Sequence, residues 1–183
     1  MEATVALLGR EGPDAFSAST LAREVGVSKA TLFHHFGTID DIPHEALQHL
    51  WSQAISQGSG NSQSARDYLQ ELGQQVILLA RKRRNFLRAN VVFLTKAIFD
   101  SRLRQRMSVS ALQMHRLMTR ALSEKLPKTI SATEIEVTAR MVEIALDGLM
   151  FRLAVITTPK ELTESKRAWS LLIELLLSRA ETS

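Results

Sequence analysis

The chain of 183 residues contains no cysteine, which excludes disulfide bonds and thiol chemistry. It has only four prolines and eight glycines, so few positions force a helix to end. No apolar run approaches the roughly 20 residues that a membrane-spanning helix needs. The first residues, MEATVALLGREG, lack the basic segment, apolar stretch and cleavage site of a secretory signal. We therefore expect a cytoplasmic protein with no membrane partner.

Motifs for catalysis and cofactor binding are missing as well. The segment HEALQH contains two of the five histidines, but its spacing is not that of the zinc motif H-E-x-x-H. There is no glycine-rich phosphate loop, no G-x-S-x-G and no group of carboxylates with metal-ligand spacing. The sequence therefore predicts neither an enzyme nor a bound cofactor or metal.

The hydrophobic residues, which make up 45% of the chain, recur at helical period, and strand-like alternation is absent. This pattern predicts an all-α fold with an N-terminal three-helix head, residues 1–45, on a larger helical body, residues 46–183. The main breaks are expected at GPD (12–14), GSGNSQS (58–64), LPKTIS (126–131) and TTPK (157–160). The predicted helices span residues 2–10, 18–25, 29–35, 39–57, 65–83, 84–100, 102–126, 132–157 and 161–181.

The segment FSASTLAREVGVSKATLFHHF has the signals of two short helices joined by a tight turn. Ser17 and Ser28 are suited to cap the two helices, and Gly26 is suited to end the first one in a left-handed conformation. This arrangement matches the helix–turn–helix unit, whose second helix enters the major groove of DNA. The expected core of the head consists of Phe16, Leu21, Ala22, Val25, Val27, Leu32 and Phe36. The residues expected to face the groove are Lys29, Ala30, Thr31, Phe33 and His34.

Residues 5–50 resemble the TetR family of bacterial transcriptional repressors. The resemblance rests on a first helix that ends before Gly12, on the segment above with L-A, G-V-S, T-L-aromatic and H-F in fixed register, and on a capped helix that follows. It implies a head that binds operator DNA as a dimer and a body that binds a small ligand, which releases the DNA. It implies DNA contacts at Ser17, Ala18, Ser19, Ser28, Lys29, Ala30, Thr31, Phe33, His34 and His35. The hydroxyl of Thr38 is a further expected phosphate contact.

The charge distribution opposes DNA binding by the head. Residues 1–57 contain three basic and seven acidic residues, although the whole chain carries +4. Where the family usually has a phosphate-binding lysine, this chain has Ile39. Residues 81–106 contain nine basic residues and one acid. If the fifth helix returns antiparallel to the fourth, Arg81 to Arg84 come near the head and supply phosphate contacts. The alternative is that these cations simply lie at a helix C-terminus, where the dipole favours them.

The segment 135–156 carries two apolar stripes on nearly opposite faces of one helix. One consists of Ile135, Ala139, Val142, Leu146, Leu149, Leu153 and Ile156, and the other of Val137, Met141, Ile144, Gly148, Phe151 and Val155. A helix that is apolar on two sides has two partners. We expect residues 135–156 and 164–180 to form a homodimer interface, in which Ala145 and Gly148 permit close approach. The alternative is a pair of central helices in a monomer.

Aromatic residues and methionines gather between these helices and the middle of the chain, where they form either ordinary core or an adaptable apolar ligand site. The residues expected to bind the ligand are Trp51, Phe86, Phe93, Met114, Met118 and Met150. Phe99 belongs to the same group. At its edge, His115, Arg116 and Arg120 suggest that the ligand carries an anionic group.

These features predict a ligand-responsive transcriptional repressor. It binds double-stranded operator DNA, with a palindromic site, as a homodimer, and a small, largely apolar molecule releases it. The alternative is a helical small-molecule binding or interaction protein whose head no longer binds DNA, and the acidic head favours that alternative.

Overall fold

The computed structural model describes residues 2–12, 16–36, 41–61, 63–82, 84–156 and 158–182, and all regular structure in these ranges is helical. This confirms the predicted all-α class. The helices are α1 (Glu2–Glu11), α2 (Ala18–Val25), α3 (Lys29–Phe36), α4 (Asp41–Asn61), α5 (Ala65–Lys82), α6 (Arg84–Phe99), α7 (Ser101–Lys125), α8 (Ala132–Val155) and α9 (Pro159–Thr182).

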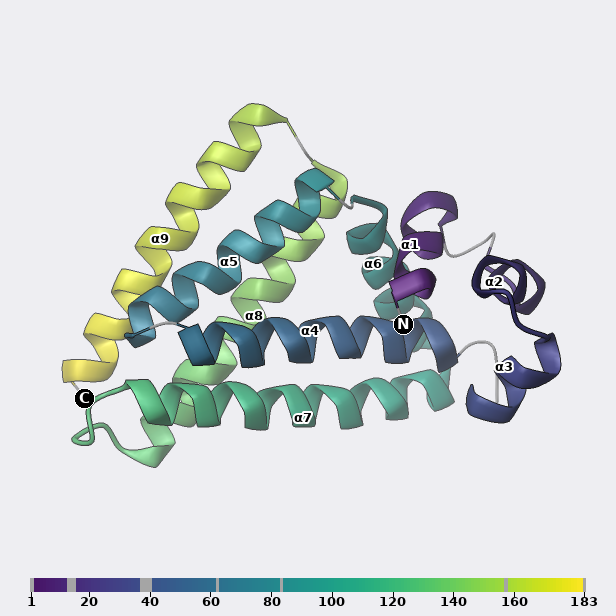
Figure 1. Ribbon diagram of the computed structural model, residues 1–183. Helices are drawn as coiled ribbons and strands as arrows, with labels where there is room; N and C mark the ends of the chain where they lie inside the picture. The colour runs from purple at the N-terminus through teal and green to yellow at the C-terminus, as the bar shows by residue number, and fades with distance from the viewer. Residues whose placement is uncertain are drawn as a thin grey trace.

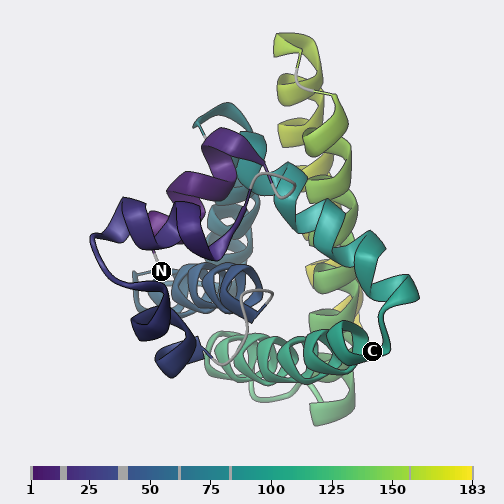
Figure 2. The same cartoon turned by 90° about the vertical axis from the view of Figure 1, so that its right-hand side faces the viewer.

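The short helices α1, α2 and α3 form a head at one end of a body of longer helices (Figure 1). In the body, α4 and α7 lie side by side, as both views show (Figures 1 and 2). α8 packs against α5, α6, α7 and α9, which places it at the centre of the body. α6 also packs against α1, so the head is in contact with the body through more than the chain connection.

Side-chain caps explain where several helices begin, because each cap accepts a hydrogen bond from a backbone N–H that has no partner within its helix. The capping oxygens belong to Ser17 for α2, Ser64 for α5, Asp100 for α7, Ser131 for α8 and Thr158 for α9. α9 begins at Pro159 rather than at the predicted residue 161. Proline is favoured at the first position of a helix, where its missing N–H has no function.

Two predicted boundaries were wrong. The expected break over residues 58–64 begins late, because α4 continues to Asn61 through Gly58 and Gly60. A glycine weakens a helix interior by about 1 kcal/mol without ending it. The expected helix 132–157 ends at Val155, and Ile156 after it is 41% exposed rather than part of the buried stripe.

The buried apolar residues form two clusters. The small cluster in the head consists of Leu7, Leu21, Ala22, Leu32 and Ile42, with Phe16 and Phe36 packed against it. The large cluster fills the body and includes Val5 and Leu8, which are neighbours of Leu7 on α1. α1 therefore contributes to both cores, and α4 does the same through Ile42 in the head and Leu47 in the body.

Candidate nucleic-acid interface and ligand cavity

The turn between α2 and α3 has the geometry that the sequence predicts. Ser17 Oγ accepts a hydrogen bond from the N–H of Thr20 at 3.1 Å, and Ser28 Oγ accepts one from the N–H of Thr31 at 3.0 Å. Gly26 ends α2 with φ 71° and ψ 29°, a left-handed conformation that favours glycine. Together these three residues fix the direction of α3 relative to α2.

The outer face of α3 is exposed along its length. Leu32 is 6% exposed and anchors the helix to the head core. The exposed residues are Ser28, Lys29, Ala30, Thr31, Phe33, His34 and His35, which are the positions expected to contact DNA. Phe33 is 43% exposed, which is unusual for so large an apolar side chain and leaves its ring available for a partner. An exposed aromatic ring can contact a thymine methyl group in the major groove.

The remaining expected DNA contacts lie at the start of α2 or outside the described residues. Ser17 and Ser19 are exposed and Ala18 is half-buried, so all three are accessible beside α3. Thr38 lies outside the residues that the structure describes. Two core predictions were wrong: Val25 and Val27 are each 39% exposed. They flank Gly26 at the corner of the turn, and the small head core is already filled by residues from α1, α2, α3 and α4.

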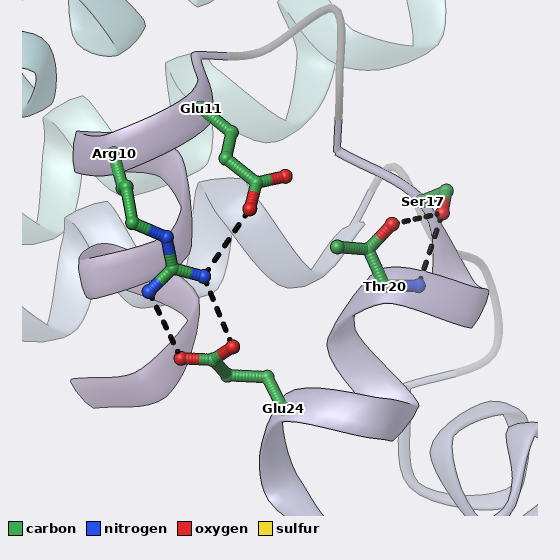
Figure 3. A network of polar contacts seen from close by, with 5 residues as sticks. All are labelled: Arg10, Glu11, Ser17, Thr20 and Glu24. Atoms are coloured by element: carbon green, nitrogen blue, oxygen red, sulfur yellow. Dashed lines mark hydrogen bonds and ion pairs between the residues drawn. The ribbon is translucent and has the colours of Figure 1, made fainter.

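The head holds its basic residues close to acids. The Arg10 guanidinium donates to both carboxylate oxygens of Glu24, at 3.2 and 3.0 Å, and to Glu11 at 3.2 Å (Figure 3). The hydrogen bonds from Arg10 hold the pKa of Glu24 below its usual value. Among the described residues of the head, Arg23 and Lys29 are therefore the cations without an ion pair. The ion pair leaves the net charge of the head unchanged but engages one of its few cations.

The basic group at the end of α5 is only partly available. Arg84 Nη2 donates to the carbonyl of Val155 at 3.0 Å, so this guanidinium satisfies the C-terminal end of α8. Arg83 lies outside the described residues, whereas Arg81 and Lys82 are exposed. A contact between Arg81 or Lys82 and DNA stays a prediction.

A cavity of about 530 Å³ lies in the body between α4, α6, α7 and α8. Its volume is in the range of sites for small organic molecules. Five of the six residues expected to bind the ligand line it: Trp51, Phe93, Met114, Met118 and Met150. Phe86 does not line it, because this fully buried ring packs behind Trp51, with ring centroids 6.3 Å apart. Phe99 is also outside it and is 90% exposed at the end of α6.

The cations expected at the edge of the cavity are placed elsewhere. His115 Nδ1 lies 3.0 Å from Glu143 Oε1, and Arg120 pairs with Glu124 on the solvent side of α7. Neither of them, nor Arg116, lines the cavity, so the predicted anion contact was wrong. Helix α7 turns these side chains toward α8 or solvent, a choice that spacing along one helix does not determine.

The cavity has polar residues that the sequence did not single out. His44 Nε2 lies 2.9 Å from Ser110 Oγ, which connects α4 to α7 at the cavity wall. Asn90 on α6 is 9% exposed, and its Nδ2 donates to the sulfur of Met150 at 3.8 Å. Asp147 on α8 also lines the cavity. Asn90 and Asp147 are each a polar residue in a largely apolar stretch of sequence. That pattern is the sequence signal that could have indicated their position in the cavity.

The second stripe of α8 is largely uncovered by the described part of the chain. Its members Val137, Met141, Ile144, Phe151 and Val155 are 38%, 37%, 64%, 57% and 59% exposed. On α9, Leu171 and Leu175 are 56% and 60% exposed. These seven residues, here called the exposed apolar face, lie on the two helices expected to form a dimer. A side chain at Gly148 would meet no atom within 4 Å, so the protomer leaves open space there.

The comparisons with known proteins agree with this architecture. Residues 1–46 match the family described as "Bacterial regulatory proteins, tetR family". A transcriptional regulator from Rhodococcus sp. Rha1 has a TM-score of 0.72 at 20% identity, covering 98% of this chain and 94% of that chain. A structure described as a TetR-family transcriptional regulator from Mesorhizobium loti has a TM-score of 0.67 at 16% identity, covering 97% and 92%. Salmonella enterica GusR gives 0.66 at 13% identity, covering 97% and 92%. A search of the curated proteins finds no match.

The chain therefore has the fold of a helix–turn–helix transcriptional regulator. Residues 1–46 match the tetR family of bacterial regulatory proteins, and nearly the whole chain has the fold of a structure described as a TetR-family transcriptional regulator. This family consists of DNA-binding regulators rather than enzymes, in agreement with the sequence prediction. Among the described residues, no group of three or more His, Asp or Glu side chains is arranged to hold a metal. No helix in the described ranges is both long and apolar enough to cross a membrane.

Proposed function

We propose that this protein is a cytoplasmic transcriptional repressor that binds a palindromic operator as a homodimer and is released by a small, largely apolar molecule. The observation that carries the proposal is the pairing of a capped, outward-facing helix α3 with an apolar cavity in the body. An exposed second helix of a helix–turn–helix suits the major groove, and a cavity of about 530 Å³ suits a small ligand.

Helix α4 gives these two sites a physical connection. Its residue Ile42 is buried in the head core, and His44, Leu47 and Trp51 line the cavity within the next three turns. A ligand that fills the cavity contacts α4, the helix that also carries Ile42, and displaces it. Because a helix transmits displacement along its axis, movement of α4 changes the position of the head.

The exposed apolar face supports the homodimer. Seven large apolar side chains on two adjacent helices are exposed, and large exposed apolar surfaces of this kind mark interaction sites. Two copies that meet through α8 and α9 form a four-helix interface about a two-fold axis. A two-fold dimer presents two copies of α3, which read two half-sites about one helical turn of DNA apart or a multiple of it.

The proposal is tested by gel retardation of the DNA upstream of the protein's own gene, with an unrelated fragment of equal length as competitor. We expect retardation at moderate salt that the competitor does not abolish. Lys29→Glu on α3 should remove it, whereas Lys128→Glu makes the same change of charge at an exposed position between α7 and α8, outside the expected interface, and should not. If neither the upstream DNA nor any other fragment is retarded, the head no longer binds DNA. The alternative of a helical small-molecule binding protein then holds.

A further inference from the structure

The lining of the ligand cavity includes one carboxylate without a basic partner among the described residues. Of the residues that line it, Arg104, Arg140, Glu143 and Asp147 are those with a full charge. Arg140 donates to Glu143 at 2.9 Å, and Arg104 donates to the carbonyl of Ile98 at 3.0 Å. Both arginines are therefore engaged by protein acceptors, and Glu143 is engaged by Arg140 and His115. Asp147 is the charged residue of the lining that has no such partner.

Asp147 is poorly stabilised as a carboxylate. It keeps contact with solvent, yet the protein atoms around it and the nearby Glu143 carboxylate raise its pKa above the usual value. None of the described cations lowers that pKa, and no hydrogen bond or ion pair to Asp147 occurs among the described residues. An acid in such a position has unused capacity to accept a hydrogen bond and to balance a positive charge.

Asn90 adds a second acceptor near the same wall. Its amide nitrogen contacts the sulfur of Met150, one helical turn from Asp147 on the same side of α8. A sulfur is a weak acceptor, and no other hydrogen bond to the Asn90 amide occurs in the described ranges. A buried amide with so little engagement is expected to bind a polar group of another molecule.

Apart from polar residues that include His44 and Ser110, the rest of the lining is apolar and aromatic. The apolar part of the lining includes Trp51, Phe93, Met107, Met114 and Met118. Methionine adapts to irregular apolar ligands, and tryptophan and phenylalanine also attract cations over their ring faces. An anionic ligand would meet the unpaired Asp147 carboxylate here, and the two arginines of the lining already donate to Ile98 and Glu143.

We propose that the cavity binds a protonated amine with a largely apolar body, with the nitrogen at Asp147 and near Asn90. This inference rests on the proposed function in one respect, namely that the cavity is the site of the regulatory ligand. It reverses the ligand charge that the sequence suggested, because His115, Arg116 and Arg120 do not line the cavity whereas Asp147 does.

The test compares three probes on one phenylhexyl skeleton, phenylhexylamine, phenylhexanol and phenylhexanoic acid, by calorimetric titration of the full chain at neutral pH. We expect the amine to bind tightest and the acid weakest. In Asp147→Asn, affinity for the amine should fall roughly tenfold, to that of the alcohol, because a charge-assisted hydrogen bond becomes a neutral one. Unchanged binding of the alcohol to the variant shows that the cavity is intact. Glu136→Gln, an equal change of charge at an exposed position of α8 outside the cavity, should leave all three affinities unaltered.

The inference is overturned if the acid binds as tightly as the amine, if Asp147→Asn does not discriminate between amine and alcohol, or if no probe binds. Gel retardation of the upstream DNA on the same preparation separates this result from the proposed function. If Asp147 discriminates between the probes but no DNA is retarded, the amine site is supported and the proposed repressor function is rejected. If DNA is retarded but Asp147 does not discriminate, the repressor function is supported and the amine site is rejected.

Discussion

Arg10 on α1 and Glu24 on α2 form a two-pronged ion pair, with guanidinium nitrogens 3.2 and 3.0 Å from the two carboxylate oxygens. Planar, paired geometry of this kind orients two helices as well as joining them. The pair also removes one of the few cations of the head from contact with an external anion. It is exposed, so its main effect falls on charge rather than on stability.

Replacing Glu24 with Gln is therefore expected to strengthen DNA binding. The change removes an acid from the head and frees Arg10 from one of its two carboxylate partners, so affinity for random DNA should rise on the order of two- to fourfold at low salt. Operator and random DNA should gain alike, because phosphates carry no sequence information. Fluorescence anisotropy over a series of salt concentrations measures the effect. An unchanged affinity would mean that this side of the head faces away from the duplex.

Thr31→Ala tests the seating of α3 in the major groove. Thr31 is exposed, and its hydroxyl contacts only Ser28 Oγ at 2.9 Å among described groups. We expect operator affinity to fall roughly tenfold, since a base or phosphate contact contributes about 1–3 kcal/mol, with Tm nearly unchanged. Thr133→Ala, at an exposed position of α8, is the matched control. Normal binding by the Thr31 variant would show that α3 does not enter the groove in this orientation.

Gly148→Glu tests the dimer. Within the protomer a Cβ at this position would meet none of the described neighbouring atoms within 4 Å, so we expect the monomer to fold. At a two-fold interface the added carboxylate would be buried without a partner, at a cost of several kcal/mol. Sedimentation equilibrium should then show monomers, while Ala132→Glu, on another side of α8, should remain dimeric. If the Gly148 variant stays dimeric, the copies associate through another surface.

Gly73→Ala tests the close packing of α5 against α9. A Cβ at Gly73 would lie 2.2 Å from Trp169 Nε1, and that indole is held by its hydrogen bond to the carbonyl of Leu69 at 2.9 Å. The ring must shift, so we expect a loss of about 1–3 kcal/mol of unfolding free energy despite the better helix propensity of alanine. Urea denaturation followed by tryptophan fluorescence measures it. An equal or higher midpoint would show that α9 moves aside freely.

Asp147→Asn is expected to stabilise the free protein. Because the pKa of Asp147 is raised on folding, its stability contribution is fully present below the unfolded pKa and is lost as pH rises through the folded value. At neutral pH the native chain therefore carries an unfavourable charge that asparagine removes. Tm should rise by roughly 1–3 °C at pH 7, and the gain should vanish as the pH falls toward the ordinary pKa of aspartate. A lower Tm at pH 7 would mean that the carboxylate has a stabilising partner.

Local signals were enough to predict the helices and the exposed face of α3. Ser17, Gly26 and Ser28 act within three or four residues of themselves, so their sequence neighbours determine what they do. The two stripes of α8 were likewise readable, because helical period alone separates Leu146 from Ile144.

Long-range packing decides what the sequence could not show. Arg84 finds its acceptor at Val155, which lies 71 residues away in the chain. Asp147 acquires its importance from the α6 and α7 residues that line the same cavity, and the ring of Phe86 contacts Trp51, which lies 35 residues away in the chain. In each case the residue type left several partners open, and the arrangement of whole helices chose among them.

The placement of Leu7 in the head core, between Val5 and Leu8 in the body core, limits how this head can be transplanted. In a fragment that ends after the three-helix head, Val5 and Leu8 would be exposed to solvent. It would also lose the part of α4 that follows Ile42. A graft of this head onto another regulator therefore needs a body surface that covers Val5 and Leu8, or polar substitutions at these two positions. Transfer of α3 to another protein thus also requires a partner for the face of α1 that carries Val5 and Leu8.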